Sequence, residues 1–244
     1  MNTSTPVQFT LQTTVGEMVA ARPSLSRLFE RLGIDYCCGG KKPLAQLAAA
    51  RGLDPAAVLG EIEAELARPA DPAEVDAAAL TLTALADHIE RTHHDYVKAE
   101  LPRLAEMAER VGRKHSWRDA RLAEVAALVP QLAEEMFSHM AKEERILFPF
   151  VRQIEAGAAD QFHCGSIANP IRQMEHEHES AGQVVARLRE LTDGFRPDEN
   201  ACNTHRALLA GLAEFEADLH RHVHKENNIL FPRALARARA ARSE

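Results

Sequence analysis

Residues 139–149 read HMAKEERILFP and residues 222–232 read HVHKENNILFP, so the chain contains one pattern twice. In each copy a histidine is followed four residues later by a glutamate and ten residues later by a proline. In an α-helix a separation of four places both side chains on one face, roughly 6 Å apart along the axis. Each copy can therefore present an imidazole and a carboxylate to one ion, and two copies indicate two ions.

A further histidine precedes each copy at nearly the same distance. His94 lies 45 residues before His139, and His178 lies 44 residues before His222; each of the two earlier histidines is followed directly by an acidic residue. Each half of the sequence therefore predicts a helix pair that supplies one histidine and then a histidine with a glutamate. If the two pairs face each other, six ligands point inward: His94, His139, Glu143, His178, His222 and Glu226.

The helical patterns that carry these residues predict an all-α fold. Four long patterns are joined by short polar or Gly/Pro-bearing connections, which is typical of an up-down-up-down four-helix bundle. These patterns cover residues 75–110, 118–156, 166–192 and 201–238. We expect Pro130 to kink or restart the second helix, and Pro149 and Pro232 to perturb the ends of the second and fourth.

A small helical domain is expected before the bundle. The segment RPADP at 68–72 divides the chain, so we predict domains at 1–70 and 71–244. In the first we expect a helix over 14–32, a loop over 33–43, and one or two short helices over 44–67, broken near Asp54-Pro55. A domain this small is marginal by itself, so docking or a homodimer through it is expected.

Composition narrows the class of protein. The chain has 244 residues and a net charge of −7, and the first 70 residues carry equal numbers of basic and acidic side chains, so the deficit lies beyond them. An acidic body without a basic stripe argues against nucleic acid as a partner. No apolar run of about 18 residues and no basic leader with an apolar core is present, so neither a membrane span nor a secretory signal is expected. We expect a cytoplasmic protein.

The ligand set indicates which metal is bound. Mixed imidazole and carboxylate ligation suits iron, manganese or zinc, whereas calcium and magnesium prefer oxygen and structural zinc prefers thiolates. Two glutamates that bridge a pair of ions would hold them about 3.5–4 Å apart. Iron is our first choice, and such a centre leaves room for water, an oxo group, dioxygen or nitric oxide.

Helical phase sorts some of the other polar residues but leaves one alternative open. His176, His220 and His224 fall on faces that predict contact with solvent, and Glu144 is expected to be a surface charge. In the first helix the preceding apolar residues favour His93 and the following ones favour His94, so periodicity alone does not choose between these two. A single core histidine is more often a packing residue than a ligand. Six inward polar groups in a repeat favour a metal, because their burial without a common partner would be costly.

The loop at 33–41, GIDYCCGGK, together with the two motifs of the bundle, resembles the repair of iron centres family, the YtfE/ScdA/DnrN type of di-iron proteins with a hemerythrin-like domain. The resemblance covers nearly the whole chain. In this family the first ligand is a histidine followed directly by aspartate, with Leu-Pro seven residues on. His94-Asp95 with Leu101-Pro102 matches this pattern, so the resemblance favours His94 over His93.

The resemblance also implies a cofactor and a role. The expected cofactor is a pair of non-haem iron ions bridged by an oxo group and by the carboxylates of Glu143 and Glu226. The expected role is the repair of iron–sulfur clusters after nitrosative or oxidative stress, by donation of iron or removal of nitric oxide. Damaged iron–sulfur proteins are then the partners, with nitric oxide or dioxygen as small ligands, and nitric oxide reduction at the centre is an open enzymatic alternative.

The adjacent Cys37 and Cys38 are the remaining candidates. The resemblance implies that they handle iron or nitrosyl groups, and the nearby Lys41 and Lys42 are expected to lower the thiol pKa. The alternative is two small residues that pack a tight turn. Adjacent cysteines are poorly suited to bond each other, and Cys164 and Cys202 are expected to be incidental.

Two other classes of function compete with repair. A hemerythrin-like carrier or sensor would bind dioxygen or nitric oxide without turnover, although dioxygen carriers are typically richer in histidine ligands. A ferritin-like oxidase is less favoured, because those bundles use Glu-x-x-His motifs and additional glutamates.

Overall fold

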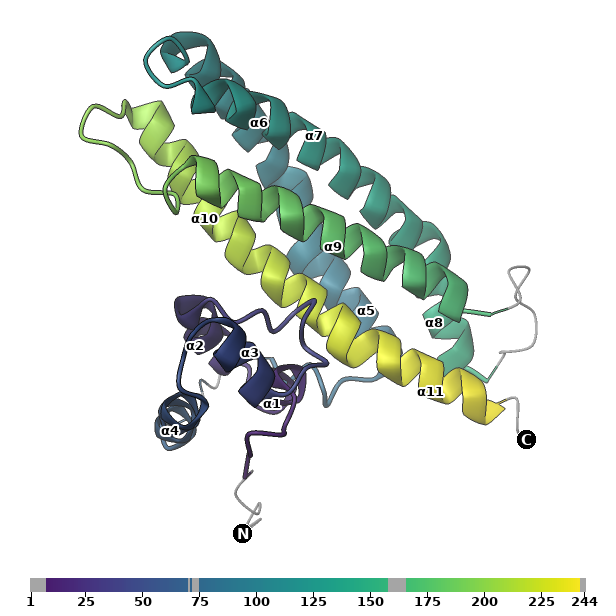
Figure 1. Ribbon diagram of the computed structural model, residues 1–244. Helices are drawn as coiled ribbons and strands as arrows, with labels where there is room; N and C mark the ends of the chain where they lie inside the picture. Colours follow the sequence, from purple (N-terminus) through teal and green to yellow (C-terminus); the bar gives the residue numbers. More distant parts are fainter. Residues whose placement is uncertain (1–7, 70, 72–74, 158–165, 242–244) are drawn as a thin grey trace. The chain divides into compact units, whose positions relative to one another are not determined.

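The computed structural model describes residues 8–69, 71, 75–157 and 166–241, and within these ranges nearly all regular structure is helical (Figure 1). The only extended pairing in the described part is an isolated antiparallel bridge between Thr14 and Pro43. The predicted all-α class is therefore confirmed. The chain divides into two compact units, residues 1–81 with 220–233 and residues 82–219 with 234–244.

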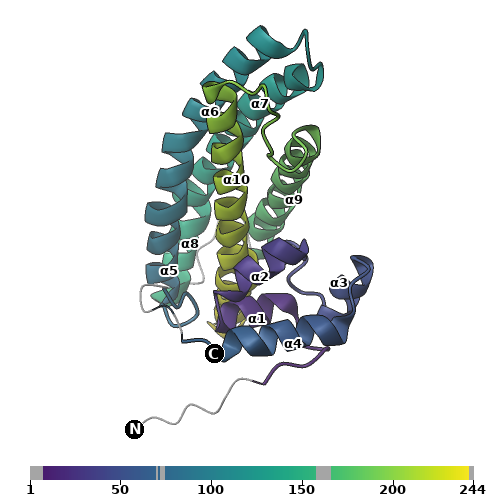
Figure 2. The same cartoon turned by 90° about the vertical axis from the view of Figure 1, so that its left-hand side faces the viewer.

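Four helical runs account for the second unit and for the segment 220–233. In both views the long helices α6, α7, α9 and α10 lie side by side (Figures 1 and 2). The four runs are α5 (Leu82–Ile89), η1 (Glu90–His94) and α6 (Asp95–His115); α7 (Arg121–Lys142), η2 (Glu143–Leu147) and α8 (Phe148–Glu155); α9 (Ala168–Leu191); and α10 (Asn203–His224), η3 (Lys225–Leu230) and α11 (Phe231–Ala241). The predicted four-helix bundle is confirmed, and no helix in the described residues is long and apolar enough to span a membrane.

The bundle core follows the apolar stripes of the sequence. Its fully buried members include Leu85, Ile89, Leu101, Leu104, Val129, Leu132 and Phe148, with Leu188 and Leu208 on the other two runs. Burial of one such side chain contributes about 1.5–3 kcal/mol. This packing fixes the positions of the helices relative to one another within the bundle. It therefore also fixes the positions of the buried polar side chains that these helices carry.

Three π-helical turns, η1, η2 and η3, interrupt the α-helices. A π turn closes i→i+5 hydrogen bonds and so shifts the helical phase, and such turns are frequent at functional sites. The phase shift across η1 explains why the sequence did not choose between His93 and His94: both are buried, with 1% and 0% of their surface exposed.

The prolines act differently from the prediction. Pro149 and Pro232 lie just after η2 and η3, and the helices continue beyond both, so the disturbance is a π turn rather than a helix end. Pro130 lies inside α7, which runs without interruption from Arg121 to Lys142. The predicted restart of that helix is therefore wrong, and the other predicted effect, a kink at Pro130, stays a prediction.

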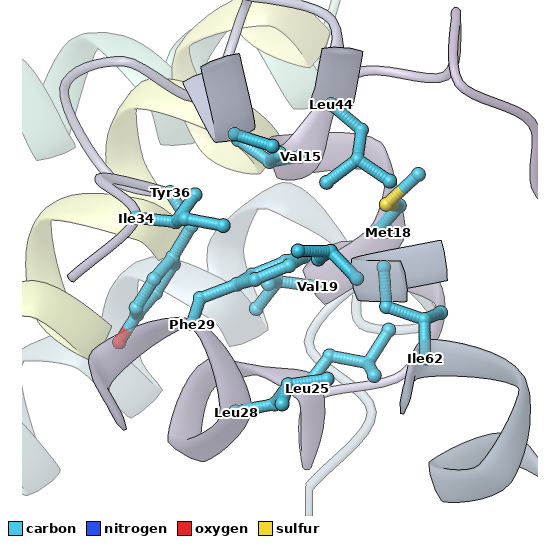
Figure 3. Close-up of a cluster of buried hydrophobic side chains, with 12 residues drawn as sticks. Val15, Met18, Val19, Leu25, Leu28, Phe29, Ile34, Tyr36, Leu44 and Ile62 are labelled. Atoms are coloured by element: carbon cyan, nitrogen blue, oxygen red, sulfur yellow. The ribbon is translucent and has the colours of Figure 1, made fainter. Parts of the chain in front are cut away.

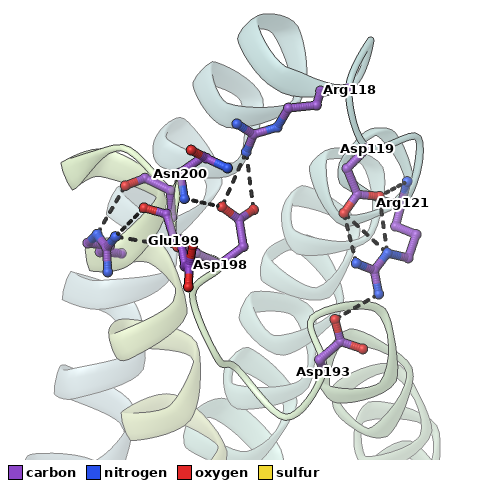
Figure 4. Close-up of polar contacts among 9 residues, drawn as sticks. Arg118, Asp119, Arg121, Asp193, Asp198, Glu199 and Asn200 are labelled. Atoms are coloured by element: carbon purple, nitrogen blue, oxygen red, sulfur yellow. Dashed lines mark hydrogen bonds and ion pairs between the residues drawn. The ribbon is translucent and has the colours of Figure 1, made fainter.

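Charged side chains join the two loops at one end of the bundle (Figure 4). Arg118 pairs with Asp198 at 3.1 Å, and Arg121 pairs with Asp119 at 2.9 Å and with Asp193 at 3.0 Å. Exposed pairs of this kind contribute up to about 1 kcal/mol each. They orient the α6–α7 and α9–α10 connections more than they stabilise the fold.

The N-terminal part of the first unit consists of α1 (Val15–Ala21), α2 (Leu25–Leu32), α3 (Leu44–Ala50) and α4 (Pro55–Leu66). A single helix over 14–32 was predicted, and this is wrong. Pro23 lacks an N–H and disfavours helical geometry at Arg22, so α1 ends there. The predicted break near Asp54-Pro55 is confirmed, with Asp54 as the N-cap of α4. Ala70 and Pro72 of the predicted boundary lie outside the described residues.

These four helices and the loop over 33–43 share a small apolar core (Figure 3). Its buried members are Val15, Met18, Val19, Leu25, Leu28, Phe29, Ile34, Tyr36, Leu44, Ala48, Val58 and Ile62. In the same unit, Asn228 of η3 reaches the loop and donates from Nδ2 to the carbonyl oxygen of Cys37 at 2.9 Å. The loop with the two cysteines is thus anchored to the segment 220–233.

Two glycines make this contact with Asn228 possible. A Cβ on Gly16 would lie 2.6 Å from Asn228 Oδ1, and a Cβ on Gly40 would lie 2.6 Å from the carbonyl oxygen of Tyr36 and closer still to Asn228 Oδ1. We therefore expect Gly40→Ala to lower the free energy of unfolding by about 1–3 kcal/mol, as overpacking does. Urea unfolding followed by circular dichroism measures the change.

The matched control is Gly60→Ala in α4, where no atom lies within 4 Å of the added Cβ. In an exposed helix this change should stabilise by up to about 1 kcal/mol. If both variants unfold at the same urea concentration, the close contact at Gly40 does not affect the free energy of unfolding.

Candidate metal centre

Four of the six predicted ligands belong to the bundle unit, and all four are buried. The π turns place two of them, because His94 is the last residue of η1 and Glu143 is the first of η2. The Nε2 atoms of His94 and His139 each lie 3.3 Å from Glu143 Oε2. On α9, His178 Nε2 lies 3.0 Å from His139 Nε2. Three imidazoles thus gather around one carboxylate.

The other two predicted ligands lie in the segment 220–233. His222 Nε2 is 3.1 Å from Glu226 Oε1, and both side chains are fully buried. The four-residue spacing therefore brings the imidazole and the carboxylate together here as it does at His139 and Glu143. In both copies the histidine is on the α-helix and the glutamate is in the π turn that follows.

The ligand atoms of the six residues form two groups, within each of which all atoms lie within 4.8 Å of one another. One group consists of His94, His222, Glu143 and Glu226, and the other consists of His139, His178 and the same two glutamates. The histidines therefore pair across the two halves of the sequence repeat. Both glutamates belong to both groups, which is the arrangement that a bridging carboxylate requires.

The chemistry of these donors fits transition-metal cations. Each group offers two imidazole nitrogens and two carboxylates, a mixture that suits iron, manganese or zinc and does not suit calcium or magnesium. Burial of so many polar groups would be costly without a shared partner. The residues therefore form a candidate site for two cations.

Two further carboxylates orient the imidazoles. Glu144 Oε1 accepts from His94 Nδ1 at 2.8 Å and from Lys98 Nζ at 2.6 Å, and Glu177 Oε2 accepts from His139 Nδ1 at 3.0 Å. When Nδ1 carries the proton, Nε2 presents its lone pair to the centre. Glu144 was expected to be a surface charge, and this is wrong, since it accepts a hydrogen bond from the buried His94, a predicted ligand.

The pKa shifts of Glu144 and Glu177 agree with their role as acceptors for the two imidazoles. The hydrogen bond from His139 lowers the pKa of Glu177 to about 2, with Lys142 and Gln173 adding to it and burial opposing it. Burial also raises the pKa of Glu144, but the hydrogen bonds from Lys98 and His94 outweigh it and the net shift is downward. Both carboxylates are therefore charged acceptors at neutral pH. Glu177 adjoins His178 in the sequence, yet only contact across the bundle shows that it serves His139.

Loss of the carboxylate at 177 should weaken metal binding without removing a ligand. We expect Glu177→Gln to reduce the affinity of the second group by about 10–100-fold, because the ring of His139 loses its charged acceptor. Competition with a coloured chelator measures this affinity. Glu134→Gln, an exposed site on α7, is the control, and equal affinities for the two variants would contradict the role of Glu177.

The extra histidines lie outside both groups. His93 Nδ1 pairs with Asp218 at 2.9 Å, and His176 is exposed as expected. His220 is half-buried, with its ring 6.2 Å from that of Tyr36. His224 was predicted to be solvated, and this is wrong: it is buried at 5.5 Å from the Tyr36 ring, and burial lowers its pKa to about 4. Helical phase in the bundle could not reveal that the N-terminal part of the unit covers this face.

The cysteine loop differs from its prediction in one respect. Cys37 is buried and Cys38 is exposed, with their sulfur atoms 4.0 Å apart and no bond between them. A lowered thiol pKa was expected, but the hydrogen bond with Cys38, burial, and the neighbouring Cys38 and Asp35 raise the pKa of Cys37 well above its ordinary value. Cys202 is a free thiol, and Cys164 lies outside the described residues.

Two family matches cover most of the chain. Residues 85–234 match the Hemerythrin family, described as a hemerythrin HHE cation-binding domain. Residues 11–66 match the ScdA_N family, described as a domain of unknown function (DUF542). The first match contains all six predicted ligands, and the second contains both adjacent cysteines.

Curated proteins are similar over nearly the full length. An iron-sulfur cluster repair protein YtfE from Musicola paradisiaca (strain Ech703) is 42% identical over 224 residues, which is 91% of this chain and 95% of the relative. Its counterpart from Enterobacter sp. (strain 638) is 40% identical over 223 residues, covering 91% of this chain and 96% of the relative. This chain therefore belongs to the YtfE family of iron–sulfur cluster repair proteins, with a hemerythrin-like cation-binding domain.

Proposed function

We propose that the protein restores damaged iron–sulfur clusters and that the six buried residues hold two non-haem iron ions for this purpose. The observation that carries the proposal is the pair of His/Glu groups that share Glu143 and Glu226. The relatives, whose name states cluster repair, supply the role. Damaged iron–sulfur proteins are then the partners, and nitric oxide or dioxygen the small ligands.

The chain's own side chains divide the work at the centre. His94 and His222 would hold one ion, His139 and His178 would hold the other, and Glu143 and Glu226, which belong to both groups, would contribute to both. Bound iron supplies open coordination positions for small ligands such as nitric oxide. Because each group has only two histidines of its own and shares both glutamates, a weakened contact of one glutamate would loosen both halves of the site, and such a site would suit release of iron to an acceptor.

Apolar side chains keep water from the centre. Phe148 is fully buried and its ring stacks on His94 at 5.6 Å, which fixes the plane of that imidazole. The adjacent Leu147 and, in the other repeat, Leu230 and Phe231 are also buried. The Phe of the first Ile-Leu-Phe-Pro segment thus supports a predicted ligand of another helical run, His94 of η1.

A transfer experiment tests the proposal. The iron-loaded protein is mixed with an apo-ferredoxin in the presence of a chelator that traps free iron, and cluster formation is followed by visible absorbance. More cluster formation than with chelated iron salt supports iron donation. Cluster formation no greater than in that control contradicts it. His176→Ala, an exposed histidine outside both groups, should transfer iron as the wild type does.

Two further results would distinguish iron donation from nitric oxide removal and from a carrier function. Uptake of nitric oxide with restored activity of a nitrosylated ferredoxin, without iron transfer, would assign the repair to nitric oxide removal. Reversible dioxygen binding by the reduced protein, without loss of iron and without cluster recovery, would favour a carrier. A homodimer through the N-terminal domain stays a prediction that sedimentation can test.

A further inference from the structure

A second set of metal-ligating side chains lies outside the His/Glu centre, in the loop between α2 and α3. The ligand atoms of Asp35, Cys37 and Cys38 all lie within 4.8 Å of one another. The two sulfur atoms are 4.0 Å apart. Two thiolates on one tetrahedral ion, with bonds of about 2.3 Å, would be separated by about 3.8 Å. The cysteines therefore already stand at a chelating distance, whereas a disulfide would need about 2.05 Å.

One carboxylate builds this geometry. Asp35 Oδ1 accepts the backbone N–H groups of Cys37 at 3.0 Å and Cys38 at 2.9 Å, and Oδ2 accepts that of Gly39 at 2.9 Å. A Cβ on Gly39 would lie 2.8 Å from the carbonyl oxygen of Asp35, so the tight path of the loop requires a glycine there. With three amides bound, Asp35 positions the thiols rather than acting as a full ligand.

The loop is also held from the other side of its backbone. Asn228 Nδ2 donates to the carbonyl oxygen of Cys37 at 2.9 Å and to that of Tyr36 at 3.3 Å. Cys37 is only 6% exposed, whereas Cys38 is exposed to solvent. One thiol is therefore fixed and the other is accessible. This arrangement gives an incoming ion a path from solvent.

We propose that Cys37 and Cys38, positioned by Asp35, form a separate two-thiolate site for a thiophilic divalent cation of the zinc and ferrous class. The Cys37 thiol donates to Asp35 Oδ1 at 3.2 Å. On binding, both thiols release their protons to solvent and the cation forms two metal–sulfur bonds, so charge is conserved. Soft ligands select such ions over calcium or magnesium. The site uses none of the donors of the bundle centre and stands independently of it.

Cadmium is the probe, because thiolate-to-cadmium charge transfer absorbs in the ultraviolet and reports sulfur ligation directly. The reduced, full-length, iron-loaded protein is titrated with Cd²⁺. We expect one equivalent per chain to produce the band. Cys37→Ser and Cys38→Ser should each weaken binding roughly 100-fold, the order expected when one ligand of a small zinc-type set is lost. Cys202→Ser is the matched control and should bind as the wild type does.

Several outcomes would overturn the site. These are no band at one equivalent, equal loss in Cys202→Ser, or unchanged affinity in both loop variants, which would leave two small residues in a tight turn. Saturation at half an equivalent would mean that the exposed Cys38 of two chains shares one ion. Glu143→Leu should keep the cadmium site while losing bundle iron, so failure here and failure of the proposed function give different results.

The positioning role of Asp35 has its own test. Asp35→Asn keeps an oxygen that can accept the amides of Cys37 and Cys38, so most of the cadmium affinity should remain. Asp35→Ala removes all three bonds and should weaken binding at least tenfold, with an unchanged near-ultraviolet spectrum as evidence of folding. Equal affinity for Asp35→Ala and wild type would contradict the role.

Discussion

Replacing Glu143 with leucine should remove both bundle metal ions, whereas replacing a histidine of one group should first affect one ion. Glu143 and Glu226 are members of both candidate groups, while each histidine belongs to one. Without a shared carboxylate, both ions lose a donor and the negative charge that offsets their mutual repulsion. We therefore expect the iron content to fall from about two per chain to none in Glu143→Leu and in Glu226→Leu.

Leucine is chosen because the side chain at 143 is fully buried. An apolar residue of similar volume in place of a buried charge is often neutral or stabilising, so the variant should fold. His178→Ala removes a donor from one group only and should leave about one firmly held ion. Metal analysis gives the content, and Mössbauer spectroscopy of iron-57 protein distinguishes paired from single iron.

The control is Glu135→Leu, an exposed glutamate on the same helix, α7, which should keep two irons. Retention of two irons in Glu143→Leu would refute the shared role. Loss of only one iron in both glutamate variants would instead assign each carboxylate to a single ion.

The parts of the site that the sequence predicted are those fixed by local geometry. A separation of four residues determines that His139 faces Glu143 and that His222 faces Glu226, whatever surrounds them. The same periodicity, with short connections, predicted the four-helix bundle. The repeat then directed attention to His94 and His178, and the structure brings both beside the glutamates.

Features that depend on contacts between elements were beyond the sequence. Glu144 and Glu177 look like surface charges on their own helices, and only the neighbouring helix supplies the histidine that each one holds. His224 is buried because the Tyr36 loop covers it. Lys41 and Lys42 suggested a lowered pKa for Cys37, but the hydrogen bond with Cys38, burial and the nearby Asp35 raise it instead.

The π turns show a third kind of limit. A hydrophobic pattern of period 3.6 assumes one continuous phase, and each π turn shifts that phase. The conflict between His93 and His94 was the visible sign of η1 in the sequence. At η2 and η3 the feature of the sequence that indicated a π turn was the proline that follows each apolar pattern. We had interpreted each proline as the cause of a disturbed helix end.

Removing the metal should lower the thermal stability of the protein by a large amount. Replacing both glutamates with leucine should give a protein that is more stable than the metal-free wild type. Glu143 and Glu226 are both fully buried, with ligand oxygens within 4.8 Å of each other. Two close carboxylates in a buried site disfavour the charged, folded state. An ion that binds only the folded chain stabilises it by about 2.7 kcal/mol at 100 times its Kd.

Two ions together then contribute about 5 kcal/mol, which corresponds to a rise in Tm of roughly 10–20 °C for a chain of this size. Differential scanning calorimetry of the protein with excess ferrous iron, under anaerobic conditions, and with a chelator measures this difference. The double variant Glu143→Leu/Glu226→Leu should show no response to iron. Its Tm should nevertheless exceed that of the metal-free wild type, because apolar side chains replace two buried charges.

The Tm of the double variant relative to the metal-free wild type distinguishes a structural role of the glutamates from a metal-binding role, because the two roles predict changes of opposite sign. A purely structural role for the glutamates predicts that the double variant is less stable than the metal-free wild type, since buried hydrogen-bonded groups would be lost. A metal-binding role predicts the reverse, because the folded site keeps two buried carboxylates close together and bound cations offset their charge. Equal Tm values for wild type with and without iron would contradict the centre itself, whatever the variants do.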